Sequence, residues 1–281
     1  MKMTIKSRLA SLILLAAMAL QIGACSENET ALTQGDKPVL PPQSSMAIDF
    51  DEFPDTNSPS AIFKFEPTDT ILRGNWGWAA IHVGVWSTII KVGLAIPVAA
   101  FAESFNHQPV QQPDGSWLWT YTVTISGIDH TVKLFGNGVT NGIEWRMLLT
   151  KAGFYTDFEW FTGFSNTPAT EGTWTLNHNP NDPVPFISIE WNRNVEDNTG
   201  EVKYTNIVPN APENGSYIHY GKTNDVTYNR FFNIFGQEEN RLINVEWNYE
   251  GYFGRVKDPM HFGDENWYCW DENLIDTICP E

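Results

Sequence analysis

The chain has 281 residues, and its 34 acidic residues outnumber 17 basic ones to give a formal net charge of −17 at pH 7. Nucleic acids and anionic lipid surfaces repel a protein this acidic, so we expect no nucleic-acid partner. The length suits one large all-β domain or two small ones and is ample for a hydrophobic core.

Residues 1–24 have the pattern of a secretory signal peptide. A basic start precedes an apolar run over residues 9–20, and small residues then lead to Cys25. The stretch Ile22–Cys25 resembles the lipobox of bacterial lipoproteins. This resemblance implies that Cys25 is acylated and becomes the first residue of the mature protein. An ordinary signal peptide followed by a chance Cys is the alternative.

The residues after Cys25 bear on where such a lipoprotein is anchored. Ser26 stands where an Asp favours retention in the inner membrane of enterobacteria, so the resemblance implies an outer-membrane protein. Glu27 and Glu29 make this stretch similar to the export signal of surface lipoproteins in the Bacteroidota. We therefore expect attachment to the membrane through an N-terminal lipid, and the periplasmic face and the cell surface both stay open.

Residues 25–60 are predicted to be the lipidated Cys and a flexible tether. Pro, Ser and acidic residues dominate this stretch, and no apolar period is sustained within it. The chain thus divides into a signal peptide over residues 1–24, the tether, and one β-rich domain over residues 61–281.

The stretch Trp78–Ala102 contains one Lys and no carboxylate. Its small residues are poor strand formers, and Pro97 would kink or restart a helix. A helical stripe runs through it, formed by Ile81, Val85, Ile89, Val92 and Ile96. We expect one or two helices at about residues 78–104, apolar on nearly all sides and therefore buried, with the stripe packed against the Trp-bearing faces of the strands around Trp145, Trp160, Trp191 and Trp247. A membrane span is the alternative, although His82 and Lys91 would be costly there.

From about residue 115 the apolar residues recur with a period of two. Apolar and polar residues alternate over 117–125, 143–149, 187–192 and 243–250, and turn signals such as Asn-Gly separate the runs. Roughly ten strands fit between residues 115 and 258. Because their connections are short, we expect an antiparallel meander. No amphipathic helix of crossover length lies between them, so parallel strands are not expected.

One local pattern, an apolar residue followed by Glu-Trp, occurs four times in these strands. The Trp residues are Trp145, Trp160, Trp191 and Trp247. In a strand, Glu and Trp point to opposite faces, so the four Trp are predicted on the inner face. They either pack across strands as core or line an aromatic cavity, and in the second case they are the candidate ligand-binding residues.

These elements predict a mainly β protein. Its fold would be a single curved antiparallel meander of about ten strands, a half-barrel or barrel, around the apolar N-terminal helix. The order of elements over residues 75–258 resembles the half-barrel of lipoprotein carriers of the LolA/LolB type. That resemblance implies a curved sheet plugged by helices around an apolar cavity. It rests on no shared motif, so it assigns no functional residue.

The two cysteines that remain after Cys25 lie near the C-terminus. Cys269 and Cys279 are ten residues apart and are predicted to form a disulfide in an oxidising envelope, with two buried thiols as the alternative. Residues 259–281 mix acidic and aromatic residues and are predicted to form a lid on the end of the sheet. Binding of calcium or a glycan by this segment is the alternative.

Catalytic signatures are missing from the sequence. It contains no GxSxG, HExxH, P-loop or GxGxxG pattern, and its six His have no partner at metal-ligand spacing. We therefore expect no enzymatic activity, no cofactor and no metal site. The first hypothesis is a lipid-anchored envelope protein that binds an apolar ligand in a β-cavity. The alternatives are a glycan-binding surface lipoprotein with exposed Trp and a structural or partner-binding envelope protein.

Overall fold

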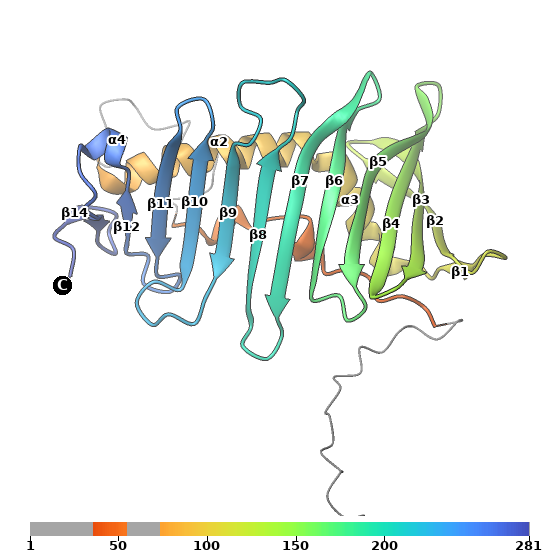
Figure 1. The fold of residues 1–281 in the computed structure, drawn as a ribbon, viewed down its shortest axis with the longest axis horizontal. Helices are drawn as coiled ribbons and strands as arrows, with labels where there is room; N and C mark the ends of the chain where they lie inside the picture. The colour runs from red at the N-terminus through yellow and green to blue at the C-terminus, as the bar shows by residue number, and fades with distance from the viewer. Residues whose placement is uncertain (1–35, 55–73, 281) are drawn as a thin grey trace, which may run out of the picture. The chain divides into compact units, whose positions relative to one another are not determined.

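Fourteen strands form one antiparallel sheet in the computed structural model, which describes residues 36–54 and 74–280. Each strand pairs with the next one along the chain, and the sheet is not closed, because β1 and β14 are its two edges (Figure 1). The strands are β1 (Val110–Gln111), β2 (Trp117–Ile125), β3 (Ile128–Val139), β4 (Gly142–Lys151), β5 (Tyr155–Asn166), β6 (Glu171–Asn179), β7 (Asp182–Asn194), β8 (Thr199–Asn206), β9 (Tyr217–Lys222), β10 (Arg230–Gly236), β11 (Arg241–Trp247), β12 (Gly254–Lys257), β13 (Tyr268–Trp270) and β14 (Asp276–Thr277).

The antiparallel meander is as the alternating runs predicted, but the expected number of about ten strands is wrong. The extra strands include β1, β13 and β14, which are two or three residues long and lie at the edges of the sheet. A strand this short shows no period of two in the sequence, because alternation needs at least four residues to be recognised.

Four Trp lie on the inner face of the sheet, as the Glu-Trp pattern predicted. Trp145, Trp160, Trp191 and Trp247 are all buried. The preceding Glu residues project outward, where they are exposed or half-buried and two of them pair with Arg146 or Arg255 of a neighbouring strand.

Glycines make room for these indoles on the adjacent strands. Gly136, Trp145, Gly163 and Trp174 lie directly opposite one another across β3 to β6, so Gly and Trp alternate from strand to strand. A Cβ on Gly163 would lie 2.2 Å from Cε3 of Trp174. The same arrangement recurs at Gly172 with Trp191 and at Gly254 with Trp270. The inner face therefore accommodates these large aromatic side chains because the cross-strand neighbours are glycines, which have no side chain.

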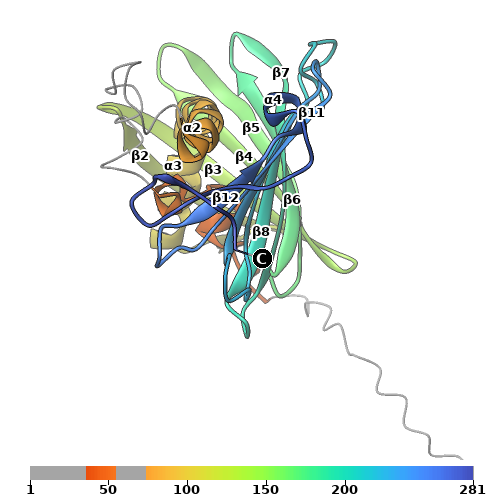
Figure 2. The same ribbon diagram turned by 90° about the vertical axis from the view of Figure 1, so that its left-hand side faces the viewer.

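The segment 36–54 belongs to the core, so the expectation of a flexible tether is wrong for these residues. Met46, Ile48, Phe50 and Phe53 are buried in the same cluster as the inner-face Trp. Two short 3-10 helices, Gln43–Ser45 and Phe50–Glu52, shape the segment. Figure 2 shows it on the same side of the sheet as the helices. Met46, Ile48 and Phe50 recur with a period of two, but this short run stands in a stretch of Pro, Ser and acidic residues whose composition favours a tether. Residues 25–35 and 55–60 of the expected tether lie outside the described part.

The anchoring contacts of this segment come from its backbone and its polar side chains. The indole N–H of Trp247 donates to the carbonyl of Glu52 at 2.9 Å, and that of Trp174 donates to Oγ of Ser45 at 3.2 Å. Arg230, which is buried, donates through Nε to the Glu52 carboxylate at 2.5 Å. Phe53 meets the Trp247 ring edge-on, with ring centroids 5.2 Å apart.

The expected helical region consists of α2 (Asn75–Gly93) and α3 (Ala95–Glu103), followed by a 3-10 turn at Ser104–Asn106. The break falls at Leu94 rather than at Pro97. Pro97 lies in the first turn of α3, where a missing N–H costs no intrahelical hydrogen bond. Among the described residues, no single helix is long and apolar enough to cross a membrane, and only α2 with the segment through Asn106 reaches that length, as a pair bent by 64°.

The helix α2 buries a different face from the one expected. The predicted stripe is exposed: Ile81 at 41%, Val85 at 53%, Ile89 at 40% and Val92 at 75%. The buried face has Trp76 in the first turn and also Val83 and Ile90, and its other members are the small residues Gly77, Ala79, Ala80, Gly84 and Ser87. Small side chains let the helix approach closely, and the space for larger ones is already filled by the segment 36–54.

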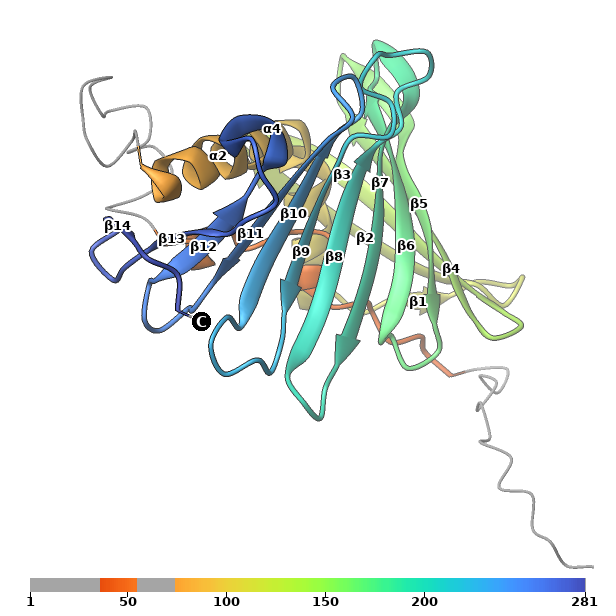
Figure 3. The ribbon, with the colours of Figure 1, turned by 60° about the vertical axis from the view of Figure 1, so that its left-hand side comes forward.

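The partners of the helices also differ from the expectation. α2 runs across the strands rather than along them and contacts β10, β12 and β13, whereas α3 contacts β2 (Figures 1 and 3). The Trp-bearing strands β4, β5 and β7 are therefore not the main packing partners of α2.

The C-terminal segment extends the sheet instead of forming the expected lid. β13 and β14 continue the meander beyond β12, and the short helix α4 (Pro259–Phe262) lies between β12 and β13 in the chain. Cys269 of β13 and Cys279 form a disulfide with their Cα atoms 5.1 Å apart. The aromatic residues that suggested a lid pack as sheet and helix side chains, because β13 pairs with both of its neighbours.

Candidate functional site

The four predicted Trp residues do not meet around one cavity. Trp145 donates through its indole N–H to Oγ of Ser165 at 3.0 Å, and Trp247 is bound to the segment 36–54, so both are packed core residues. Within the described part of the chain, the buried indole nitrogens of Trp160 and Trp191 have no hydrogen-bond partner, and each of these two residues lines a separate cavity. The predicted lipidation residue, Cys25, lies outside the described residues.

Exposed Trp platforms are missing. All twelve Trp lie in the described residues, and each is either buried or half-buried. A stacking surface for a sugar ring needs an open aromatic face, so this arrangement does not match the one that a glycan-binding sheet would present.

An apolar cavity lies beside the exposed stripe of α2, and we call it the α2 groove. It has a volume of about 480 Å³. Val85, Trp86 and Ile89 of α2 form one wall. The opposite wall comes from β7, β10 and β11, through Phe186, Ile187, Ile234, Phe235 and Ile243. The exposed stripe thus faces aromatic and branched side chains across an open groove, as is typical of sites that bind small apolar molecules.

The α2 groove also has polar lining residues, among them the charged residues Glu213, Glu239 and Arg241. Arg241 binds Asp258, with 2.5 Å between Nη2 and Oδ2. Asp258 also accepts a hydrogen bond from Nε1 of Trp78 at 3.0 Å. Nδ1 of His82 donates a hydrogen bond to the carbonyl of Trp78 at 2.9 Å. Burial lowers the pKa of His82, so this side chain stays neutral near pH 7. Because Arg241 is already paired and two carboxylates line the groove, this polar part disfavours an anionic group.

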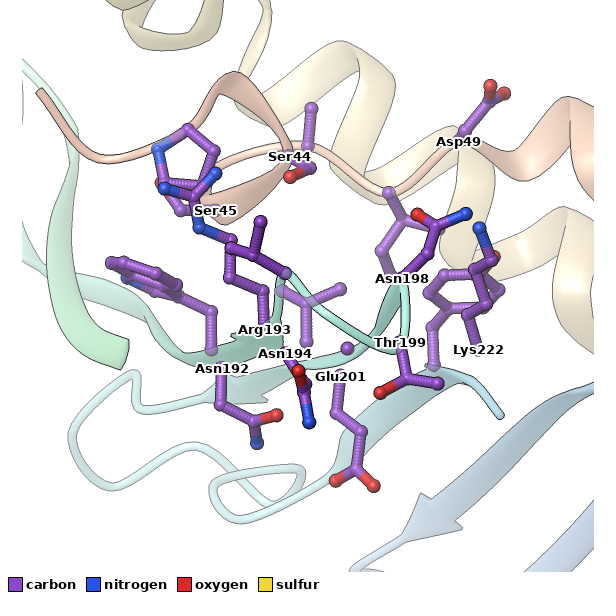
Figure 4. Close-up of a pocket in the computed structure, with 18 of the residues that line it drawn as sticks. Ser44, Ser45, Asp49, Asn192, Arg193, Asn194, Asn198, Thr199, Glu201 and Lys222 are labelled. Carbon is purple, nitrogen blue, oxygen red and sulfur yellow. The ribbon is translucent and has the colours of Figure 1, made fainter. Parts of the chain in front are cut away.

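A second cavity lies under the β7–β8 hairpin and has many amide, hydroxyl and charged side chains in its lining. It has a volume of about 370 Å³ and is bounded on its other side by the segment 36–54. In Figure 4, Arg193 extends toward this segment at Ser45, whereas Asn192, Asn194 and Glu201 point the other way. Nε of Arg193 donates to the carbonyl of Ala169 at 3.0 Å. The amide and hydroxyl side chains that line this cavity are of the kind that binds sugars, but they do not converge on one point.

The residues described by the structure offer no group of three or more His, Cys, Asp or Glu that could hold a metal ion. No protein family model, no characterised protein and no solved structure matches this chain.

Sequence reasoning missed the residues that line the α2 groove. Trp86, Phe186 and Phe235 were not among the candidate residues, because they come from α2, β7 and β10 and meet only in the folded chain. The one available signal was the stripe over Ile81–Ile96, which was recognised but assigned to the buried side.

Proposed function

We propose that this protein is a lipid-anchored envelope protein that binds the hydrocarbon chain of a small molecule in the α2 groove. The observation that carries the proposal is the exposed stripe of α2 opposite Phe186 and Phe235. An exposed apolar surface of this kind is unfavourable in water, and a bound hydrocarbon would cover it. The proposed occupant is a small molecule because the site is a groove with two apolar walls rather than a flat patch.

The lipid anchor is the second part of the proposal and rests on the lipobox resemblance at Ile22–Cys25. Replacing Cys25 by Ser removes the thiol that would carry the lipid. The variant should leave the membrane fraction, which cell fractionation at high salt measures. Partition of Cys25→Ser with membranes at the wild-type level would contradict the anchor.

The binding proposal is tested by native mass spectrometry of the full-length protein, looking for a co-purified amphiphile. Ile89→Asp places a charge in the α2 groove and should abolish the bound species. Leu242→Asp is the matched control, because Leu242 is also 40% exposed but its neighbours Arg241 and Ile243, not Leu242, line the groove. If wild type carries no apolar molecule and binds none when it is added, or if both variants bind like wild type, the proposal fails.

Carbohydrate binding is the second candidate, and the polar cavity under the β7–β8 hairpin favours it. Its amide and hydroxyl side chains can bind sugar oxygens. The buried position of Trp191 weighs against it, because a sugar has no aromatic face there to stack on. A co-purified saccharide in the same mass spectra, lost in Asn198→Ala, would favour this candidate over the first.

A further inference from the structure

A smaller cavity adjoins the far end of α2, and we call it the Trp160 pocket. It has a volume of about 300 Å³. Its lining comes from the α2–α3 junction and from β3 to β6 with the turn that follows, through Val92, Gly93, Ile96, His130, Lys151, Tyr155, Trp160, His178, Asn179 and Pro180. No residue of this lining, all of which the structure describes, is an Asp or a Glu.

Two buried hydrogen-bond donors in this lining lack partners. Neither Nε1 of Trp160 nor the hydroxyl of Tyr155 has a hydrogen-bond partner among the described residues, although both atoms are buried. The two rings are 5.9 Å apart between centroids, and the Trp160 side chain is 3% exposed. An indole N–H can only donate. Because unpaired buried donors are unfavourable, two of them in one pocket indicate that an acceptor belongs there.

The charge of the pocket points to an anionic acceptor. Nζ of Lys151 lies 4.1 Å from the centre of the Phe154 ring and forms no ion pair with a carboxylate of the described residues. His130 is buried, and its Nδ1 donates a hydrogen bond to the carbonyl of Ile128 at 3.0 Å. Nδ1 of His178 lies 3.1 Å from Oδ2 of Asp182. In a chain with twice as many acidic as basic residues, a lining with an unpaired Lys and no carboxylate is selective for negative charge.

The Trp160 pocket continues the line of the α2 groove along the helix. Val92, the most exposed residue of the stripe, lines the pocket one turn beyond Ile89 of the groove. Phe186 lines the groove, and its ring lies 4.9 Å from the ring of His178, which lines the pocket. Phe186 also packs against the helix backbone at the pocket, since a Cβ on Gly93, which lines the pocket, would lie 3.1 Å from Cε1 of Phe186.

We infer that the Trp160 pocket binds the anionic oxygen head group, carboxylate or phosphate, of a single-chain amphiphile whose hydrocarbon lies in the α2 groove. Trp160 and Tyr155 would donate hydrogen bonds to the head group, and Lys151 would balance its charge. The inference rests on the proposed function, because it uses the groove for the chain.

Three probes with the same hydrocarbon separate the head group from the chain. Equilibrium dialysis against full-length protein would compare radiolabelled dodecanoate, dodecyl phosphate and 1-dodecanol. At least one anion should bind about tenfold or more tightly than the alcohol, because hydrogen bonds to a charged group are stronger than those to a neutral one. Preference for dodecanoate or for dodecyl phosphate would distinguish a carboxylate from a phosphate head.

Matched variants then locate the head group. Tyr155→Phe and Lys151→Gln should each weaken binding of the preferred anion about tenfold and leave binding of 1-dodecanol unchanged. Trp160→Phe should act in the same way, but it removes core volume, so the two milder variants decide the matter. Trp267→Phe is the control, since Trp267 is a half-buried indole that lines neither cavity.

The outcomes separate the head-group inference from the proposed function. If the alcohol binds as tightly as both anions, or if the Tyr155 and Lys151 variants bind the anions like wild type, the head-group site is wrong while the groove stands. If none of the three probes binds wild type, both fail.

Discussion

Single residues on the inner face of the sheet are constrained by their cross-strand neighbours. Gly163 lies between Trp145 and Trp174, and a Cβ there would lie 2.5 Å from the carbonyl of Thr173 as well as against the Trp174 ring. Gly163→Ala should therefore lower the free energy of unfolding by about 2–4 kcal/mol, measured by urea denaturation. Gly236→Ala is the control, because no atom lies within 4 Å of its Cβ position, and it should change stability by less than about 0.5 kcal/mol. Equal effects at both positions would contradict this packing.

Asp258 is a buried carboxylate whose charge contributes to stability. It is fully buried, and although desolvation raises its pKa, hydrogen bonds from Arg241 and Trp78 and the charge of Arg241 lower it overall. A carboxylate with a depressed folded-state pKa stabilises the fold above its unfolded pKa of about 3.9, and this contribution is lost as the pH falls through the folded-state pKa.

Replacing Asp258 by Asn leaves Arg241 without its buried partner. The variant should be less stable than wild type by about 3–5 kcal/mol at pH 6, and the difference should shrink as the pH falls below about 4. Urea unfolding across pH 2–7 measures this. Asp182→Asn removes a side chain that is 58% exposed and should cost less than about 1 kcal/mol throughout. A difference for Asp258→Asn that does not depend on pH would show that the charge is not the cause.

At the scale of elements, α2 shows how an apolar helix can be positioned by its smallest residues. Ile89 and Ile90 are neighbours in sequence, but Ile89 is 40% exposed and Ile90 only 4%. Ile90→Asp should destabilise the protein by several kcal/mol or prevent folding, whereas Ile89→Asp should cost less than about 1 kcal/mol. Thermal and urea unfolding of the two variants tests which face is buried. A larger loss of stability for Ile89→Asp than for Ile90→Asp would contradict this assignment of the buried face.

The same helix shows where sequence reasoning stops. The helical spacing of apolar residues could be read from the sequence because it is local. The buried face could not, because apolar residues surround the helix on nearly all sides and no polar face separates the alternatives. The stripe of branched residues was the stronger signal, but the sheet selects the small residues that allow close approach.

For the whole molecule, the antiparallel meander could be predicted from the sequence, but the segments that pack on its inner face could not. Alternation in runs such as β7 and β11 specifies strands and their inner faces, since each side chain's direction follows from its own position. The burial of Phe50 and Phe53 depends instead on Phe232 and Trp247, which are nearly two hundred residues away. The candidate site shares this limit. Trp160 was predicted and Tyr155, on the same strand, was not, while Lys151 joins them only through the pairing of β4 and β5.

The segment 36–54 therefore decides where the folding unit begins. Its side chains Met46, Ile48, Phe50 and Phe53 fill the space between the helices and the sheet. At about 1.5–3 kcal/mol for each buried side chain, removing the four would forfeit roughly 6–12 kcal/mol. That range is comparable with the whole stability of a typical domain, about 5–15 kcal/mol. Loss of Glu52 would also leave Arg230 buried without its carboxylate.

Two truncated chains test this assignment. A chain that starts at residue 36 should unfold cooperatively in urea and elute as a single species in gel filtration. A chain that starts at residue 61, at the beginning of the domain expected from composition, should lack a cooperative transition, because the inner faces of Trp174 and Trp247 would be open to water. Adding a synthetic peptide of residues 36–54 should restore a transition to the shorter chain, since the peptide supplies the missing core side chains. If the shorter chain unfolds at the same urea concentration as the longer one, the segment is a tether after all and its contacts contribute nothing to the fold.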